Sequence, residues 1–337
     1  MKKFKKYISI LLLAAVLAAC VFALAACKDK EFTLEHSYSE VYTKGDAAIE
    51  ASSAAFRILK INDTHLVSGS TKKDEKTLDG LKTVLDRTQF DMIILDGDIF
   101  EGYSAKLSFD KPAAAKVVGD LIDGYGKPWT FAPGNNDGQR GGSNEDIIAY
   151  WLGYEHFLAG NIEGINGAMQ FFIDINYDGR LAHSIAIMDS LSLDENDNYD
   201  YIKRDQTEAL IAGIEERSTL VSIFFHMPTP AFEKAYTEGE AYGNFPFSDE
   251  YPVDDIPGNA LFDELTANIN NIGLISVGHV HSNNMAYYYN GRYYQLSSLG
   301  GYGAVGSGKT SPSYTLTTVD LTTTDSRTAY AFEKLSA

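Results

Sequence analysis

Cysteine is nearly absent from this sequence. The 337 residues include only Cys20 and Cys27, both within the first 27 positions. The rest of the chain therefore has neither an intrachain disulfide nor a thiolate metal site. Basic residues are also scarce, because 28 lysines and arginines face 46 aspartates and glutamates, a formal net charge of −18. Nucleic acid selects basic surfaces, so we expect no nucleic-acid partner.

The overall composition is that of a globular protein. Hydrophobic residues make up 45% of the chain and charged residues 22%. These proportions exclude a disordered tail, a collagen-like rod and a disulfide-stapled miniprotein. The body of the chain, residues 56–337, shows no internal repeat and no obvious linker, so we expect one large domain there.

The first 26 residues have the pattern of a bacterial lipoprotein signal peptide. Lysines at positions 2, 3, 5 and 6 precede an uncharged stretch over residues 7–26. The small residues before Cys27 resemble a lipobox, in which the cysteine is lipidated and becomes the new N-terminus. An uncleaved anchor is the alternative, because about twenty apolar residues can span a bilayer. Either way we expect export and attachment to the outer face of the cell membrane, with residues 27–55 as a tether that has room for one short strand.

Apolar runs of strand length alternate with helical patterns in the body. Helices are expected at 73–88 and 112–125, where apolar residues recur at helical spacing. The late strands favour hairpins, as around Asn290-Gly291. We therefore predict an α/β protein with mixed sheets. Strands are expected at 56–62, 91–95, 128–132, 170–175, 184–188, 220–225, 272–277, 292–296, 314–320 and 327–333.

Metal-competent side chains follow five of these strands, at the point where each strand ends. Loops at the carboxyl ends of strands are where α/β proteins place their chemistry. A single His or Asp there is usually a hydrogen-bonding residue, but five such clusters in succession predict a site for two metal ions. Members of a pair two residues apart face the same way on an extended chain. The clusters are Asp63-Thr64-His65, Gly97-Asp98, Gly134-Asn135-Asn136-Asp137, His226-Met227-Pro228 and Gly278-His279-Val280-His281.

In their order, these clusters resemble the motifs of the calcineurin-like metallophosphoesterases: Asp-x-His, Gly-Asp, Gly-Asn-His-(Asp/Glu), His and Gly-His-x-His. The resemblance covers residues 56–337 and is closest to the branch near the purple acid phosphatases, which has counterparts of residues 188–190, 226–228 and 300–303. It implies two mixed β-sheets packed as a sandwich and flanked by α-helices.

The resemblance also implies a ligand set and an activity. The mixed nitrogen and oxygen donors suit Mn, Fe or Zn without choosing among them. The implied activity is metal-dependent hydrolysis of phosphate esters by a metal-bound hydroxide, with phosphomonoesters favoured and diesters or polyphosphate as alternatives. One ion would be held by Asp63, His65 and His281, Asp98 would bridge, and Asn135, His226 and His279 would hold the second ion.

Asn136 stands where the family usually has histidine. Asparagine can donate a hydrogen bond to a phosphate but cannot pass a proton to the leaving oxygen. We assign Asn136 to the catalytic group and expect Asp137 to orient it through a hydrogen bond. The same departure supports an alternative of another class, a non-catalytic surface lipoprotein that keeps the fold as a binding module. A transporter's solute-binding lipoprotein would explain the signal but not the clusters.

Two further motifs are weaker. Residues 303–310 match a nucleotide-binding P-loop, but Pro312 and β-branched residues follow in place of a helix. We interpret the stretch as a glycine loop beside the metal site. Residues 174–179 begin like a calcium loop, but the twelfth position is Ile185 rather than glutamate, and we expect a hairpin turn.

Overall fold

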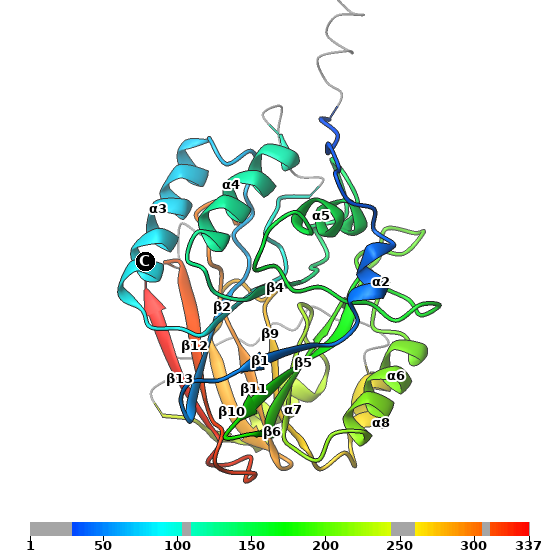
Figure 1. Ribbon diagram of the computed structural model, residues 1–337, viewed down its shortest axis with the longest axis vertical. Helices are drawn as coiled ribbons and strands as arrows, with labels where there is room; N and C mark the ends of the chain where they lie inside the picture. Colours follow the sequence, from blue (N-terminus) through cyan, green and yellow to red (C-terminus); the bar gives the residue numbers. More distant parts are fainter. Residues whose placement is uncertain (1–28, 103–108, 244–259, 305–310, 337) are drawn as a thin grey trace, which may run out of the picture.

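The computed structural model describes residues 29–102, 109–243, 260–304 and 311–336 (Figure 1). The predicted signal peptide, Cys27 and most of the P-loop-like stretch at 303–310 lie outside the described residues. Within the described part, none of the helices has the length and apolarity needed to span a bilayer.

Two mixed β-sheets form the body, with helices around them (Figure 1). In the smaller sheet the strand order is β13-β12-β2-β3-β4, and β2, β3 and β4 run parallel. A helix lies in each connection between these parallel strands, because parallel neighbours need a long crossover connection. The strands are β2 (Ala55–Ile61), β3 (Met92–Asp96), β4 (Trp129–Ala132), β12 (Ser313–Asp320) and β13 (Tyr330–Ser336), and the helices are α3 (Lys72–Arg87), α4 (Lys111–Asp123) and α5 (Asn144–Trp151).

The larger sheet has the order β1-β5-β6-β7-β9-β11-β10-β8. One apolar core lies between the two sheets and under α3, α4 and α5, and a second joins this sheet to α6, α7 and α8. The strands are β1 (Ala47–Glu50), β5 (Gln170–Tyr177), β6 (Arg180–Met188), β7 (Val221–Phe224), β8 (Glu240–Ala241), β9 (Ile272–Val277), β10 (Met285–Tyr289) and β11 (Arg292–Leu296), and the remaining helices are α2 (Glu40–Lys44), α6 (Arg204–Glu215), α7 (Ala231–Glu238) and α8 (Ala260–Thr266).

Local sequence explains where α3 and β3 lie. Thr71 caps the first turn of α3, because its side chain accepts from the Asp74 backbone while the Asp74 carboxylate accepts from the Thr71 backbone. Leu81, Val84 and Leu85 then present one apolar face to the sheet. Every residue of β3 is buried, as expected for a central parallel strand covered on both faces.

The predicted fold class is confirmed, and so are most of the predicted strands. The strand expected at 327–333 begins later, at Tyr330, because a turn closed by the Thr328 amide and the Asp325 carbonyl (3.1 Å) precedes it. Both expected hairpin turns occur: Asn290 and Gly291 have φ of 46° and 81°, and Asp178 and Gly179 have φ of 52° and 71°.

Part of the segment expected to be a tether is packed against the body instead. β1 pairs in parallel with β5 at the edge of the large sheet, and Val41 of α2 is fully buried. Asp29 forms a bidentate ion pair with Arg140, at 2.8–3.0 Å. The tether interpretation is therefore corrected for residues 29–50, where alternating side chains supply an edge strand and charged residues find partners.

Candidate metal centre

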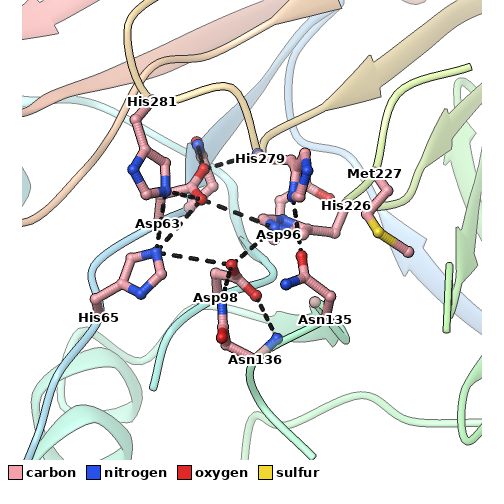
Figure 2. A network of polar contacts seen from close by, with 12 residues as sticks. Asp63, His65, Asp96, Asp98, Asn135, Asn136, His226, Met227, His279 and His281 are labelled. Carbon is pink, nitrogen blue, oxygen red and sulfur yellow. Dashed lines mark hydrogen bonds and ion pairs between the residues drawn. The ribbon is translucent and has the colours of Figure 1, made fainter. Parts of the chain in front are cut away.

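The structure brings the seven predicted ligands together where the two sheets meet (Figure 2). The loops after β2, β3 and β4 come from the smaller sheet, and those after β7 and β9 come from the larger one. The carboxyl ends of these strands therefore converge on one place, as the sequence pattern predicted. The seven residues are Asp63, His65, Asp98, Asn135, His226, His279 and His281.

A first group consists of Asp63, His65, Asp98 and His281, with one ligand atom from each lying within 4.8 Å of the others. Asp63 Oδ1 is 3.2 Å from His281 Nε2 and 3.7 Å from His65 Nε2. His65 Nε2 is 3.1 Å from His281 Nε2 and 3.6 Å from Asp98 Oδ2. Separations near 3–4 Å are those expected between ligands that share one ion at about 2.1 Å.

A second group shares the same Asp98 carboxylate. Asp98, His226 and His279 each offer a ligand atom within 4.8 Å of the others, and Asp98 Oδ2 is 3.3 Å from His226 Nε2. Asn135 Oδ1 lies 2.9 Å from His279 Nδ1, which places the amide oxygen in the same group. Asp98 belongs to both groups, so the two groups share one carboxylate.

Two buried atoms of this cluster point to cations as their missing partners. Asp63 Oδ1 and His226 Nε2 make no hydrogen bond of good geometry within the described part of the chain, although both side chains are completely buried; their nearest partners are His281 Nε2 at 3.2 Å and Asp98 Oδ2 at 3.3 Å. Orphaned buried polar atoms cost free energy, and a cation between them removes that cost. His226 Nδ1 donates to the Asp96 carbonyl at 2.8 Å, so Nε2 is the ring nitrogen left to face the cluster. The residues present therefore fit a metal centre.

The ionisation of the cluster makes metal binding weaker at neutral pH than at alkaline pH. Burial and the neighbouring His226 charge lower the pKa of His279 to about 4, so this side chain is a neutral ligand at pH 7. Burial opposes the charged form of His226, but the Asp98 and Asp63 carboxylates overcome it and raise the pKa of His226 to about 10. In the metal-free protein His226 is therefore protonated, and a bound ion has to displace that proton.

The backbone is strained at four of the ligands. Asp63, His65, Asp98 and His279 have φ of 51°, 48°, 50° and 70°, in the left-handed region that few side chains adopt. The loops hold one another there: the Asp63 amide donates to the Gly97 carbonyl at 3.0 Å, and the His65 amide donates to the Asp98 carbonyl at 3.1 Å.

The left-handed turn also separates two ligands that are neighbours in sequence. His281 belongs to the first group and His279 to the second. The expectation that histidines two residues apart face the same way is therefore wrong here, because φ of 70° at His279 ends the extended conformation. The division agrees with the ligand set implied by the family resemblance.

Asn136 contacts the shared Asp98 carboxylate with both its backbone and its side chain. Its amide nitrogens donate to Asp98 Oδ1 from the backbone at 2.8 Å and to Asp98 Oδ2 from Nδ2 at 2.6 Å (Figure 2). Asp137 does not orient Asn136 as expected. Its buried carboxylate accepts from the backbone amides of Asp98 (2.8 Å), Gly134 (2.8 Å) and Phe100 (3.0 Å). Asp137 thus joins the loops after β3 and β4, because their amides supply the donors that a buried carboxylate needs.

Sequence reasoning missed several residues around the cluster. Glu101 Oε2 is 3.7 Å from His65 Nδ1, and the Tyr199 ring meets the His279 ring edge-on at 5.2 Å between centroids. Lys60 and Asp96 form a buried ion pair just behind the ligands. The sequence signal for this pair is weak, because β2 also carries Arg57 and Asp96 is the last residue of β3.

The sequence matches a known family over most of its body. Residues 56–283 match the model of the calcineurin-like phosphoesterase family. A search of curated proteins finds no match to this sequence.

Several solved structures resemble the fold. A dimetal phosphatase from Danio rerio has 9% identity and a TM-score of 0.52, and the match covers 83% of this chain and 98% of that one. The protein TT1561 of Thermus thermophilus has 13% identity and a TM-score of 0.47, covering 84% and 99%. A purple acid phosphatase from yellow lupin (Lupinus luteus) seeds has 12% identity and a TM-score of 0.43, covering 85% and 54%. At 9% identity the Danio rerio structure supports the two-sheet fold alone.

Proposed function

Since this chain belongs to the calcineurin-like phosphoesterase family, we propose that it is a phosphoric ester hydrolase that works with two metal ions. The observation that carries the proposal is the shared carboxylate. Asp98 Oδ2 lies 3.6 Å from His65 Nε2 in one ligand group and 3.3 Å from His226 Nε2 in the other. A carboxylate placed between two groups of metal ligands can contact both ions of a two-metal site.

The proposed ligands divide as the two groups do. Mn, Fe or Zn would suit this mixture of carboxylate, imidazole and amide donors. Two such ions, when bound, offset the charge of phosphate oxygens and lower the pKa of a water molecule to about 7. Asp63, His65 and His281 would hold the first ion, Asn135, His226 and His279 the second, and Asp98 both.

The side chains near the cluster limit which leaving groups depart easily. Asn136 Nδ2 lies at the bridging carboxylate, where it can donate a hydrogen bond to a bound phosphate, but an amide supplies no proton. His279 has a pKa of about 4 because it is buried and faces His226, so it carries no proton to donate at neutral pH. We therefore expect esters with good leaving groups, such as aryl phosphomonoesters, to react fastest.

The location is also part of the proposal. The lysines at positions 2, 3, 5 and 6, the uncharged stretch that follows and the small residues before Cys27 support export and lipid attachment at Cys27. Phosphate esters outside the cytoplasm are then the substrates, with phosphomonoesters preferred over diesters and polyphosphate.

The test is hydrolysis of p-nitrophenyl phosphate by the full chain, purified in detergent and supplied with Mn²⁺ or with Fe and Zn. We expect metal-dependent turnover that falls by orders of magnitude in Asp98→Asn, which keeps the shape of the side chain but weakens the bridge. Bis-p-nitrophenyl phosphate and polyphosphate in parallel reactions measure the substrate preference. A folded chain that hydrolyses none of these with any of the metals contradicts the proposal.

Asn136 favours one second candidate, a binding module without catalysis. Its amide is already bonded to Asp98, so the position offers a phosphate one weak donor and no acid. Such a module would bind two ions and inorganic phosphate but release no product from any of the three substrates. Ion content measured on the same preparation separates this outcome from loss of the site.

A further inference from the structure

A buried ion pair lies directly behind the ligand cluster. The Lys60 ammonium in β2 is 3.3 Å from Asp96 Oδ2 at the end of β3, and neither side chain has any solvent exposure. Neither oxygen of Asp96 accepts a hydrogen bond of good geometry from the described residues. The pair is therefore buried with much of its hydrogen-bonding capacity unused.

Fold stability is a poor explanation for such a pair. Removing two charges from water costs several kcal/mol per ion, and their attraction repays this only when the geometry is excellent. Apolar residues of similar volume often replace buried pairs with no loss of stability. Lys60 lies between apolar residues of β2, and Asp96 ends a strand that is otherwise apolar, so aliphatic side chains would ordinarily be expected at both positions. A role other than stability is needed.

Each member of the pair takes part in a hydrogen bond next to a ligand loop, Lys60 through its ammonium and Asp96 through its backbone carbonyl. Lys60 Nζ donates to the Val277 carbonyl at 2.5 Å, and Val277 is the last residue of β9, two positions before His279. The Asp96 carbonyl accepts from His226 Nδ1 at 2.8 Å, and Asp96 lies two positions before Asp98. Because β2 and β3 belong to one sheet and β9 to the other, the pair connects the two sheets at the cluster.

We propose that Lys60 and Asp96 are positioning residues for the second metal ion. The ion pair fixes the distance between the loop that carries Asp98 and the loop that carries His279, and it keeps the Asp96 carbonyl under His226. His226 and His279 belong to the second group alone, whereas the first group's two histidines, His65 and His281, lie farther along their loops. The inference rests on the proposed metal-dependent function.

The experiment measures Mn²⁺ binding to the full chain in detergent, from the EPR signal of free Mn²⁺. Lys60→Met removes the ammonium, Asp96→Asn removes the carboxylate charge, and the double variant Lys60→Met, Asp96→Leu replaces the pair with apolar side chains. We expect all three to bind the second Mn²⁺ 10- to 100-fold more weakly, the range found when groups supporting metal ligands are removed. The spin-coupled EPR spectrum of the two bound Mn²⁺ ions should weaken in parallel. Melting of the metal-free double variant should occur at or above the wild-type temperature.

Tyr330→Phe is the matched control. Tyr330 OH also joins the two sheets, through a 3.2 Å hydrogen bond with Ser222, but it lies beside Gly273 at the opposite end of β9. This variant should bind both Mn²⁺ ions as the wild type does. If Lys60→Met fails to fold, the double variant and Asp96→Asn still test the positioning role.

The possible outcomes are distinct. Wild-type affinity for two ions in the double variant overturns the inference and leaves the proposed function intact. Equally weakened binding of the second Mn²⁺ in Tyr330→Phe also overturns it, because the loss of any contact between the two sheets would then have the same effect. A wild-type chain that binds fewer than two ions contradicts the proposed function itself, and the inference with it.

Discussion

Replacing Gly97 with alanine should displace His226 from the metal centre. Gly97 has φ of +79°, and a Cβ built there would lie 2.4 Å from Cγ and Nδ1 of the His226 ring. Carbon atoms in contact need about 3.5 Å, so the ring would have to move by about 1 Å. A shift of that size lengthens the bond from His226 Nδ1 to the Asp96 carbonyl and moves Nε2 away from Asp98. Misplacement by 1 Å can cost about 100-fold in rate, and we expect at least that loss in kcat/KM.

Gly291→Ala separates this effect from backbone strain. Gly291 has φ of +81°, and a Cβ there meets no atom within 4 Å. Both variants carry the left-handed penalty of about 1–2 kcal/mol in the free energy of unfolding, but only Gly97→Ala carries the clash. The assays are hydrolysis of p-nitrophenyl phosphate, Mn²⁺ content and thermal melting. Unchanged kinetics in Gly97→Ala, or an equal loss of activity in Gly291→Ala, would refute the reasoning.

Three further predictions concern the same cluster. Asn136→His should speed hydrolysis of an alkyl phosphate at least 10-fold relative to p-nitrophenyl phosphate, because imidazolium supplies the leaving oxygen with a proton; equal effects on both esters would argue against this. Mn²⁺ affinity should rise about 10-fold per pH unit between pH 7 and 9 for each proton displaced. The reason is that the Asp98 and Asp63 carboxylates hold the pKa of His226 at about 10 against its burial. Mn²⁺ titrations at several pH values give the slope, and an affinity that does not change with pH would contradict the prediction. His279→Ala and His281→Ala should each retain one tightly bound ion, as measured by metal analysis of the dialysed protein.

The ligands could be found from the sequence because they follow strands whose apolar runs are plain. Once β2, β3 and β9 are located, the polar residues after them must lie at one edge of the sheets. Their division into two groups could not be found from spacing, since the left-handed turn at His279 reverses the expected orientation. The family resemblance, not the periodicity, separated His279 from His281.

Other parts of the structure left little trace in the sequence. Helices α5 and α7 are eight residues long and α8 is seven, too short for a clear apolar period. The Lys60–Asp96 pair joins two strands that are separate in sequence, so only the folded chain shows that the charges meet. Asp137 looked like a partner of Asn136 because the two are adjacent, but its carboxylate is taken by backbone amides.

The docked N-terminal segment determines how far the body can travel from a lipid on Cys27. A free chain from residue 27 to residue 55 would reach about 100 Å, whereas only Lys28 lies between Cys27 and Asp29, whose carboxylate pairs with Arg140, a backbone span of about 7 Å. Arg140 also lies next to a residue that contacts the ligand cluster. The side chain of Gln139 donates to the backbone carbonyl of Asn135 at 2.8 Å. On the proposal that Cys27 is lipidated, catalysis is confined to a thin layer next to the bilayer. Lipid head groups are concentrated in that layer, whereas dissolved phosphate esters have only their bulk concentration there.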